Sequence, residues 1–306
     1  MIEHWLIEPF QFEVQRRALL EVVIAGGLCG ALGAHIILRR LGFMADALSH
    51  AVLPGVVIAY IRVGVGGVLY GALAAGVLAA SAIGLITRNR RVREDTAIGI
   101  VMTGGFALGI VLISTLRSYA TALEDFLFGN VLLVSPEDLQ ITLILAAIVG
   151  TVMFVFHRRF VLRAFDPDTA EALGLRGDLL DLVLLMTLAA TVVVALRSIG
   201  NILVVALLIT PAATARLLTD RVLPMMLIGA ALGAGSGVVG MIVAYQLNLA
   251  TGALIVCVAT AIFLAVLVLE PRRGLVGVLR SRRRRDVASP TAGLPEAAAP
   301  ATTHSH

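Results

Sequence analysis

Long apolar stretches, separated by short polar connections, recur along almost the whole chain. They lack the strict alternation of β-strands, and lipid leaves only helices or closed barrels able to satisfy the backbone polar groups, so they predict membrane-spanning helices. A hydrocarbon core of about 30 Å needs roughly 20 apolar residues per crossing. The stretches cover residues 18–38, 47–62, 66–86, 97–116, 139–156, 179–196, 200–218, 223–245 and 250–269. We therefore expect an all-α polytopic membrane helix bundle with eight or nine transmembrane helices.

Composition supports this prediction and excludes several kinds of chemistry. Of the 306 residues, 59% are hydrophobic and 14% are charged, with a mean hydropathy of +0.97. A soluble domain of this length cannot hide so much apolar surface. All 24 basic residues are arginines. The lack of lysine excludes a phosphate-binding loop that ends in Lys and any Schiff-base chemistry, so we expect no ATP hydrolysis by this chain itself.

Arginine clusters predict which loops face the cytoplasm, because cytoplasmic loops are enriched in positive charge. The clusters at 88–93, 158–163 and 282–285 mark the inside. Counting crossings between them places the loops at 117–136 and 246–250 outside.

The orientation of the first helix stays open at this point. Arg16 and Arg17 at its start compete with Arg39 and Arg40 at its end for the cytoplasmic side. If the second helix starts at the cytoplasmic side, Asp46 and His50 near its start would lie closer to the membrane surface than a substrate-binding site is expected to lie.

The chain divides into three parts. Residues 1–17 are expected to form an interfacial segment, with Trp5 and Phe10 at headgroup depth, and residues 18–270 form the transmembrane domain. Residues 271–306 are a basic and then disordered cytoplasmic tail. Seven arginines and three acids follow from Glu270 onward, so the whole net charge of +4 sits there. We expect this tail to contact anionic lipid and not nucleic acid. His304 and His306 at its end are more often incidental than metal-sensing.

Small residues four positions apart favour close approach of helices. General packing within the bundle is the ordinary interpretation, and a seam between two copies of the chain is the alternative. The spaced glycines are Gly26 and Gly30, Gly67 and Gly71, Gly105 and Gly109, and Gly229, Gly233 and Gly237. Cys29 and Cys257 lie in apolar runs without the spacing of a metal or redox motif, so they are expected to be packing residues.

The stretch DALSHAVLPG places ionisable groups inside the second apolar run. A charge near mid-bilayer costs roughly 2.5–3.5 kcal/mol, so it demands a reason. Asp46 and His50 are four residues apart and share a helical face. Ser49 lies beside them. Pro54 weakens the helix a turn later and frees backbone carbonyls that can face a pore.

A carboxylate and an imidazole form a half-site for a divalent first-row cation. Two ligands are too few for a tight cage, but two copies of the chain on a two-fold axis would supply two Asp and two His. The alternative is that Asp46 only caps the helix and His50 makes a buried hydrogen bond to it. The spacing alone does not separate these interpretations.

Other polar residues in the apolar runs are less specific. Glu21 and His35 are fourteen residues apart, so they share a helical face but cannot touch. Asn201 lies near one end of a later helix, with Thr210 and Pro211 in its second half. The proline permits a bend, which suits gating and is equally common as a static kink.

The inside loop FDPDTAEALGL carries the signature of a short capped helix. Asp166 and Pro167 would begin it, Ala170 and Glu171 lie within it, and Gly174 would end it. Such a helix is either a docking element for a partner or an ordinary interfacial connector.

Taken together, four runs resemble the integral permease of bacterial ABC importers for manganese, zinc or iron, in the same order over about residues 8–270. They are LRRLGFMADALSHAVLPGV, LFGNVLLVS, FDPDTAEALGL and IGNILVVALLITPAATARLL. The resemblance implies a homodimeric bundle of the vitamin B12-importer type in the bacterial plasma membrane. It also implies two copies of a separate ABC ATPase subunit and an extracytoplasmic metal-binding lipoprotein.

The resemblance also implies roles for individual residues. Asp46 and His50 would coordinate the transported metal ion (Mn, Zn or Fe), and no cofactor would be bound permanently. The loop from Asp166 to Gly174 would be the coupling helix that contacts the ATPase. Residues expected to line the pore or act in gating are Ser49, Pro54, Asn201, Thr210 and Pro211. Transport would follow alternating access of the ion site, driven by ATP.

Three other functions remain alternatives. The first is a permease for an iron chelate or vitamin, which would need a wide cavity lined by neutral polar groups. The second is a proton-coupled secondary metal transporter, which would need no ATPase. The third is an intramembrane hydrolase using Asp46 and His50; the lack of HExxH and GxSxG sequences argues against it.

Overall fold

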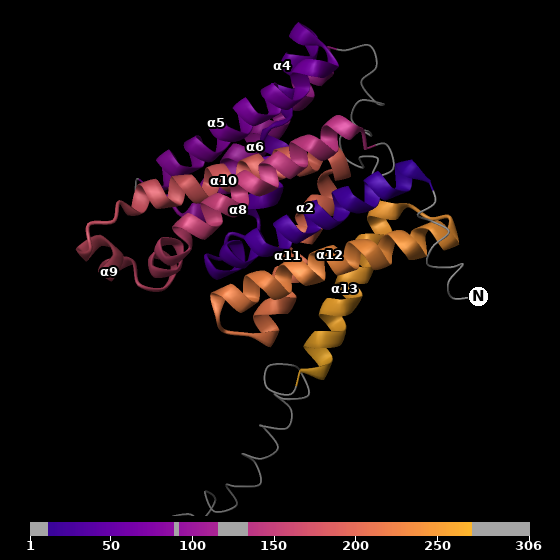
Figure 1. Cartoon of the computed structure of the whole chain (residues 1–306). Coiled ribbons are helices and arrows are strands. Elements are labelled where there is room, and N and C mark those ends of the chain that lie inside the picture. The colour runs from indigo at the N-terminus through magenta and orange to yellow at the C-terminus, as the bar shows by residue number, and fades with distance from the viewer. Residues whose placement is uncertain (1–11, 89–91, 116–133, 271–306) are drawn as a thin grey trace, which may run out of the picture.

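The computed structural model of the chain describes residues 12–88, 92–115 and 134–270, and every regular element in these ranges is helical (Figure 1). Within them, nine helical spans are long and apolar enough to cross a membrane. The spans are α2 (Glu13–Leu38), α3 and α4 together (Met44–Val63), α5 (Val68–Arg88), α6 (Glu94–Ile113), α8 (Pro136–Phe165), α10 (Gly177–Ile199), α11 (Asn201–Leu218), α12 (Val222–Leu247) and α13 (Thr251–Leu269). The 3-10 helix η2 (Val65–Gly67) and the short α9 (Pro167–Ala172) complete the described elements. The predicted all-α membrane bundle is confirmed.

The first helix begins earlier than its apolar run. α2 starts at Glu13, so the last residues of the expected interfacial segment, 13–17, are helical and continuous with the first apolar run. Arg17 forms an ion pair with Glu13 one turn before it, which satisfies both charges along the helix and lets it extend past the apolar stretch. Trp5, Phe10 and the tail from 271 to 306, with His304 and His306, lie outside the described residues.

Ion pairs at one end of the bundle link the end of α2 to the predicted cytoplasmic loops. Arg39 at the end of α2 and Arg163 near the end of α8 both pair with Asp181 in α10. At the end of α5, Arg88 pairs with Asp178 at 3.2 Å. Arg88 and Arg163 belong to the predicted cytoplasmic loops, so α2 ends on the side that the arginine pattern assigns to the cytoplasm.

The second span is two helices and not one. α3 (Met44–Ala51) and α4 (Leu53–Val63) meet at Val52, and Pro54 lies in the first turn of α4. Proline lacks an amide hydrogen, so the carbonyl of His50, four residues earlier, loses its α-helical donor. The break predicted from the Pro54 position is confirmed.

Backbone-to-backbone contacts hold α2 against α11 and α12. A Cβ added to Gly30 would lie 2.1 Å from the carbonyl oxygen of Gly229, and one on Gly26 would lie 2.8 Å from that of Gly233. On the neighbouring face, a Cβ on Gly33 would lie 1.9 Å from the Leu208 oxygen. These glycines therefore serve packing inside the chain, as the ordinary interpretation of their spacing predicts.

Candidate metal site

Asp46 and His50 lie on one face of α3. His50 Nε2 is 3.5 Å from Asp46 Oδ1, and the side chains are 17% and 34% exposed, respectively. The second ring nitrogen of His50, Nδ1, is buried and has no hydrogen-bond partner. The ring packs edge-on against Phe106 of α6, with 4.8 Å between ring centroids. A carboxylate and an imidazole are thus adjacent, and each has an atom left that can coordinate a metal ion.

The alternative role for Asp46, as a helix cap, is wrong. The N-cap residue of α3 is Phe43, and no side chain caps this end. Asp46 lies in the first turn, where a negative charge is favourable. At 3.5 Å, its contact with His50 is also long for a direct hydrogen bond, so the pair does not satisfy itself.

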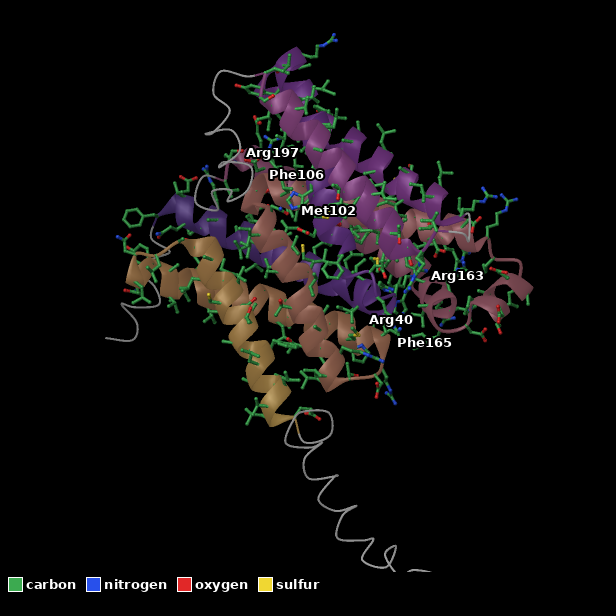
Figure 2. All side chains as sticks on the ribbon, turned by 180° about the vertical axis from the view of Figure 1, so that it is seen from behind. Arg40, Met102, Phe106, Arg163, Phe165 and Arg197 are labelled. Atoms are coloured by element: carbon green, nitrogen blue, oxygen red, sulfur yellow. The ribbon has the colours of Figure 1, made fainter. Side chains whose placement is uncertain are left out.

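The depth of the pair follows from its neighbour on α6. Phe106 is twelve residues beyond Glu94, where α6 leaves the cytoplasmic face, so it lies about 18 Å along the helix. Figure 2 shows Met102 and Phe106 along the bundle between Arg197 and the end that holds Arg40, Arg163 and Phe165. His50 therefore lies inside the bundle, away from the end that holds Arg40 and Arg163, although its span starts near that end.

The residues expected to line the pore fall into two groups. Ser49 is fully buried and its hydroxyl donates to the Asp46 carbonyl at 2.7 Å, and Pro54 is buried in α4. Their contribution to the site is thus the shape of α3 and the break after it, which leaves the His50 carbonyl without its helical donor.

The other group lies in α11. Asn201 is the first residue of this helix, at its outer end, and its buried Oδ1 has no partner. Thr210 is about 14 Å further along the helix. Pro211 is buried inside the helix, and the Thr210 carbonyl accepts a hydrogen bond from Thr214 at 2.8 Å. The proline is accommodated without interrupting the helix.

The short cytoplasmic helix predicted from the sequence is α9. Asp166 caps it by accepting a hydrogen bond from the Thr169 amide at 2.9 Å, Pro167 follows in the first turn, and Gly174 ends the segment with φ +74°. Hydrogen bonds from the Thr169 hydroxyl and amide hold the pKa of Asp166 below its usual value, so the cap is ionised at neutral pH. Ala170 is buried and Glu171 is exposed. Figure 1 shows α9 projecting at the end of the bundle where α2 and α8 finish.

Several partners of the polar residues could not be found from spacing. Glu21 accepts a hydrogen bond from Thr142 of α8 at 2.7 Å, and the His35 ring lies 6.1 Å, between centroids, from that of His157, also on α8. Both residues therefore face the same neighbour, without touching each other. In the sequence, Glu21 and His35 stood out only as polar residues within an apolar run, which does not indicate their partners.

Across residues 12–88, 92–115 and 134–270, no cluster of three or more His, Cys, Asp or Glu side chains is arranged to hold a metal ion. The expected half-site of Asp46 and His50 therefore gains no third ligand of these types from the described part of one chain.

Comparison with known proteins identifies the family. Residues 11–270 match the family described as ABC 3 transport family. The manganese transport system membrane protein MntC of Listeria monocytogenes is 44% identical, over 87% of this chain and 94% of that relative. A probable iron transport system membrane protein of Haemophilus influenzae is 38% identical, over 86% of this chain and 96% of that relative.

A solved structure agrees with these relatives. The structure described as PsaBC from Streptococcus pneumoniae in complex with Fab superposes with a TM-score of 0.80 at 36% identity, covering 91% of this chain and all of the matched chain. The nine apolar spans and a family match over residues 11–270 lead to one conclusion: this multi-pass membrane protein belongs to the ABC 3 transport family.

Proposed function

We propose that this chain is the permease subunit of an ATP-driven importer that carries a divalent transition-metal ion, with Mn²⁺ as its main cargo, across the bacterial plasma membrane. The observation that carries the proposal is the Asp46 and His50 pair within the apolar span Met44–Val63, with His50 Nδ1 buried and unpartnered. A carboxylate oxygen and an imidazole nitrogen suit first-row divalent ions, and the oxygen favours the harder Mn²⁺. The manganese and iron relatives support this choice of cargo.

A second copy of the chain completes the site. Phe43, which is 79% exposed, and the partly exposed Asp46 and His50 follow one another along α3. If this face meets its copy on a two-fold axis, the ion is held by two carboxylates and two imidazoles. Because each chain offers two side-chain ligands, the site binds the ion loosely enough to release it.

Two partner proteins follow from the same geometry. α9 projects at the cytoplasmic end, where two copies of a separate ATPase subunit would dock, one on each permease. A metal-binding lipoprotein would deliver the ion at the outer end, near the starts of α2 and α11. ATP binding then switches the Asp46 and His50 site from outward to inward exposure by alternating access.

The direct test is transport by the reconstituted complex. We expect proteoliposomes that hold the permease with its ATPase subunits, supplied with the metal-loaded lipoprotein, to take up radiolabelled manganese only when ATP is present. Uptake that persists without ATP and follows a proton gradient would indicate a secondary transporter. ATP-driven uptake of an iron chelate, with no uptake of the free ion, would also contradict the proposal.

The position of α3 against α6 provides a second test. A Cβ on Gly105 would lie 2.8 Å from Ala51 Cα, so Gly105→Ala pushes α3 away from α6 and shifts the adjacent His50. We expect the concentration of manganese that gives half-maximal uptake to rise on the order of tenfold, since the groups that orient ligands control metal affinity at this level. Gly104→Ala is the matched control, because its Cβ would meet nothing within 4 Å. Equal behaviour of the two variants would show that the spacing of α3 and α6 does not set the site.

A further inference from the structure

A continuous series of ion pairs joins the cytoplasmic ends of α9, α8, α10 and α2. Arg163 of α8 donates from Nη1 to Glu171 Oε1 at 3.1 Å and from Nη2 to Asp181 Oδ2 at 3.3 Å. The other oxygen of Asp181 accepts a hydrogen bond from Nη1 of Arg39, the C-cap residue of α2. Glu171 marks the α9 end of this series and Arg39 the α2 end.

Arg163 at the centre of the series is held from two sides. Its side chain is only 17% exposed, and it bridges two carboxylates on different elements. Its guanidinium also packs on the backbone of Gly177, where an added Cβ would lie 2.4 Å from Cζ. A displacement of α9 is therefore transmitted to Asp181 through Arg163, because this side chain has little room to move independently.

At the other end, Arg39 adjoins the turn that leads into the ion site. The amide of Leu41 donates to the Ile36 carbonyl at 2.9 Å, and that of Arg40 to the Ile37 carbonyl at 3.2 Å, which closes the helix end. Arg40 has a φ of +61°, a conformation that costs a non-glycine residue about 1–2 kcal/mol. Backbone strain of this kind is typical of switch segments, and α3 with Asp46 starts four residues later.

The surroundings leave room for Arg39 to change partners. A cavity of about 580 Å³ lies at this end of the bundle, and Arg39, Glu94, Arg163 and Asp181 all line it. Nη2 of Arg39 is buried without a hydrogen-bond partner, and a buried unpaired donor is costly. Glu94, at the start of α6, lines the same cavity and already interacts electrostatically with Arg39, so it is the acid with which Arg39 can pair when the turn moves.

We propose that Glu171, Arg163, Asp181 and Arg39 form an ion-pair relay that transmits movement of α9 to the turn between α2 and α3, and so repositions Asp46 and His50. The inference rests on the proposed function, because the movement of α9 comes from the ATPase subunits. The relay explains how a force applied at α9 reaches the start of α3, the helix that carries Asp46 and His50.

The test compares transport with ATP hydrolysis in the reconstituted complex. In Arg163→Gln, we expect the ATPase rate to persist while the number of manganese ions carried per ATP falls on the order of tenfold, within the range of typical coupling free energies. Gly177→Ala should act in the same way, because its Cβ displaces the guanidinium without removing a charge. Glu171→Gln removes the first link at an exposed position (57%) and does not threaten folding.

Arg88→Gln is the matched control. Arg88 lines the same cavity and pairs with Asp178, yet both side chains are largely exposed and neither belongs to the relay. We expect its ratio of ions to ATP to equal that of the unchanged complex. In addition, the double variant Glu171→Gln with Arg163→Gln should transport no worse than Arg163→Gln alone, because links in one series are not additive.

The outcomes separate the relay from the function on which it rests. If the unchanged complex carries no manganese with ATP, the proposed function fails. If it does, and Glu171→Gln and Gly177→Ala keep the ratio of ions to ATP, the relay is overturned while the function stands. An additive double variant, or an Arg88→Gln complex that loses coupling to the same extent, would also overturn it.

Discussion

We expect the replacement of Asp46 with asparagine to lower ATP-driven manganese uptake by about 100-fold, at the upper end of what the loss of groups that support a metal site costs. The amide keeps the volume of the side chain but removes its charge, and the half-site is left with one imidazole. Because Asp46 is 34% exposed and does not cap α3, we expect the replacement to reduce the stability of the fold only slightly. The measurement is initial uptake of radiolabelled manganese by the reconstituted complex, at matched amounts of folded permease.

Asp178→Asn is the control for this variant. It removes an acid of the same type from the exposed cytoplasmic end of α10, and we expect its uptake to remain within twofold of the unchanged complex, as is usual for exposed ion pairs. His50→Ala should resemble Asp46→Asn, since both remove a ligand from one site. Normal uptake in Asp46→Asn would refute the assignment of this pair as the ion site.

We expect Gly30→Ala to destabilise the permease by about 1–3 kcal/mol, because its new Cβ would lie 2.1 Å from the carbonyl oxygen of Gly229. Neither backbone can give way locally, since Gly26 and Gly33 fix α2 against α12 and α11 on either side. We expect less folded protein in the membrane and an earlier loss of monodisperse protein on heating in detergent.

Gly27→Ala serves as the comparison within the same helix. Its Cβ would lie 3.9 Å from the Ala230 oxygen, which is ordinary contact distance, so helix propensity should make it neutral or slightly stabilising. If both alanine variants melt alike, the close approach of α2 and α12 does not carry the stability assigned to it.

Much of the architecture follows from the order of polar and apolar residues. The apolar run that begins at 139 became α8, and the run at 179 became α10, because in lipid a long apolar segment has only one way to satisfy its backbone. The cap at Asp166, the stop at Gly174 and the break before Pro54 are local effects of single residues, so they too were predictable.

The direction of α2 and the depth of the ion pair were not predictable, because both depend on contacts between distant residues. Arg39 pairs with Asp181, and His50 packs on Phe106; neither neighbour is indicated by any local pattern. Arginine counts around α2 were balanced, so charge alone gave no answer. The relay was hidden for the same reason, since its members belong to four different elements.

The close packing of α2 against α11 and α12 has a consequence for biosynthesis. α2 is complete at residue 38, whereas α12 begins at residue 222, and ribosomes add about 5–20 residues per second. For about 10–40 s, the nascent first helix therefore lies in the bilayer without the α12 backbone that fills its glycine face. For the first 6–25 s or so of this time, until α8 is complete at residue 165, Glu21 and His35 also lack some or all of their α8 neighbours. During this time α2 needs other contacts in the membrane. We therefore expect the insertion machinery to stay bound to α2 until the last third of the chain has been synthesised.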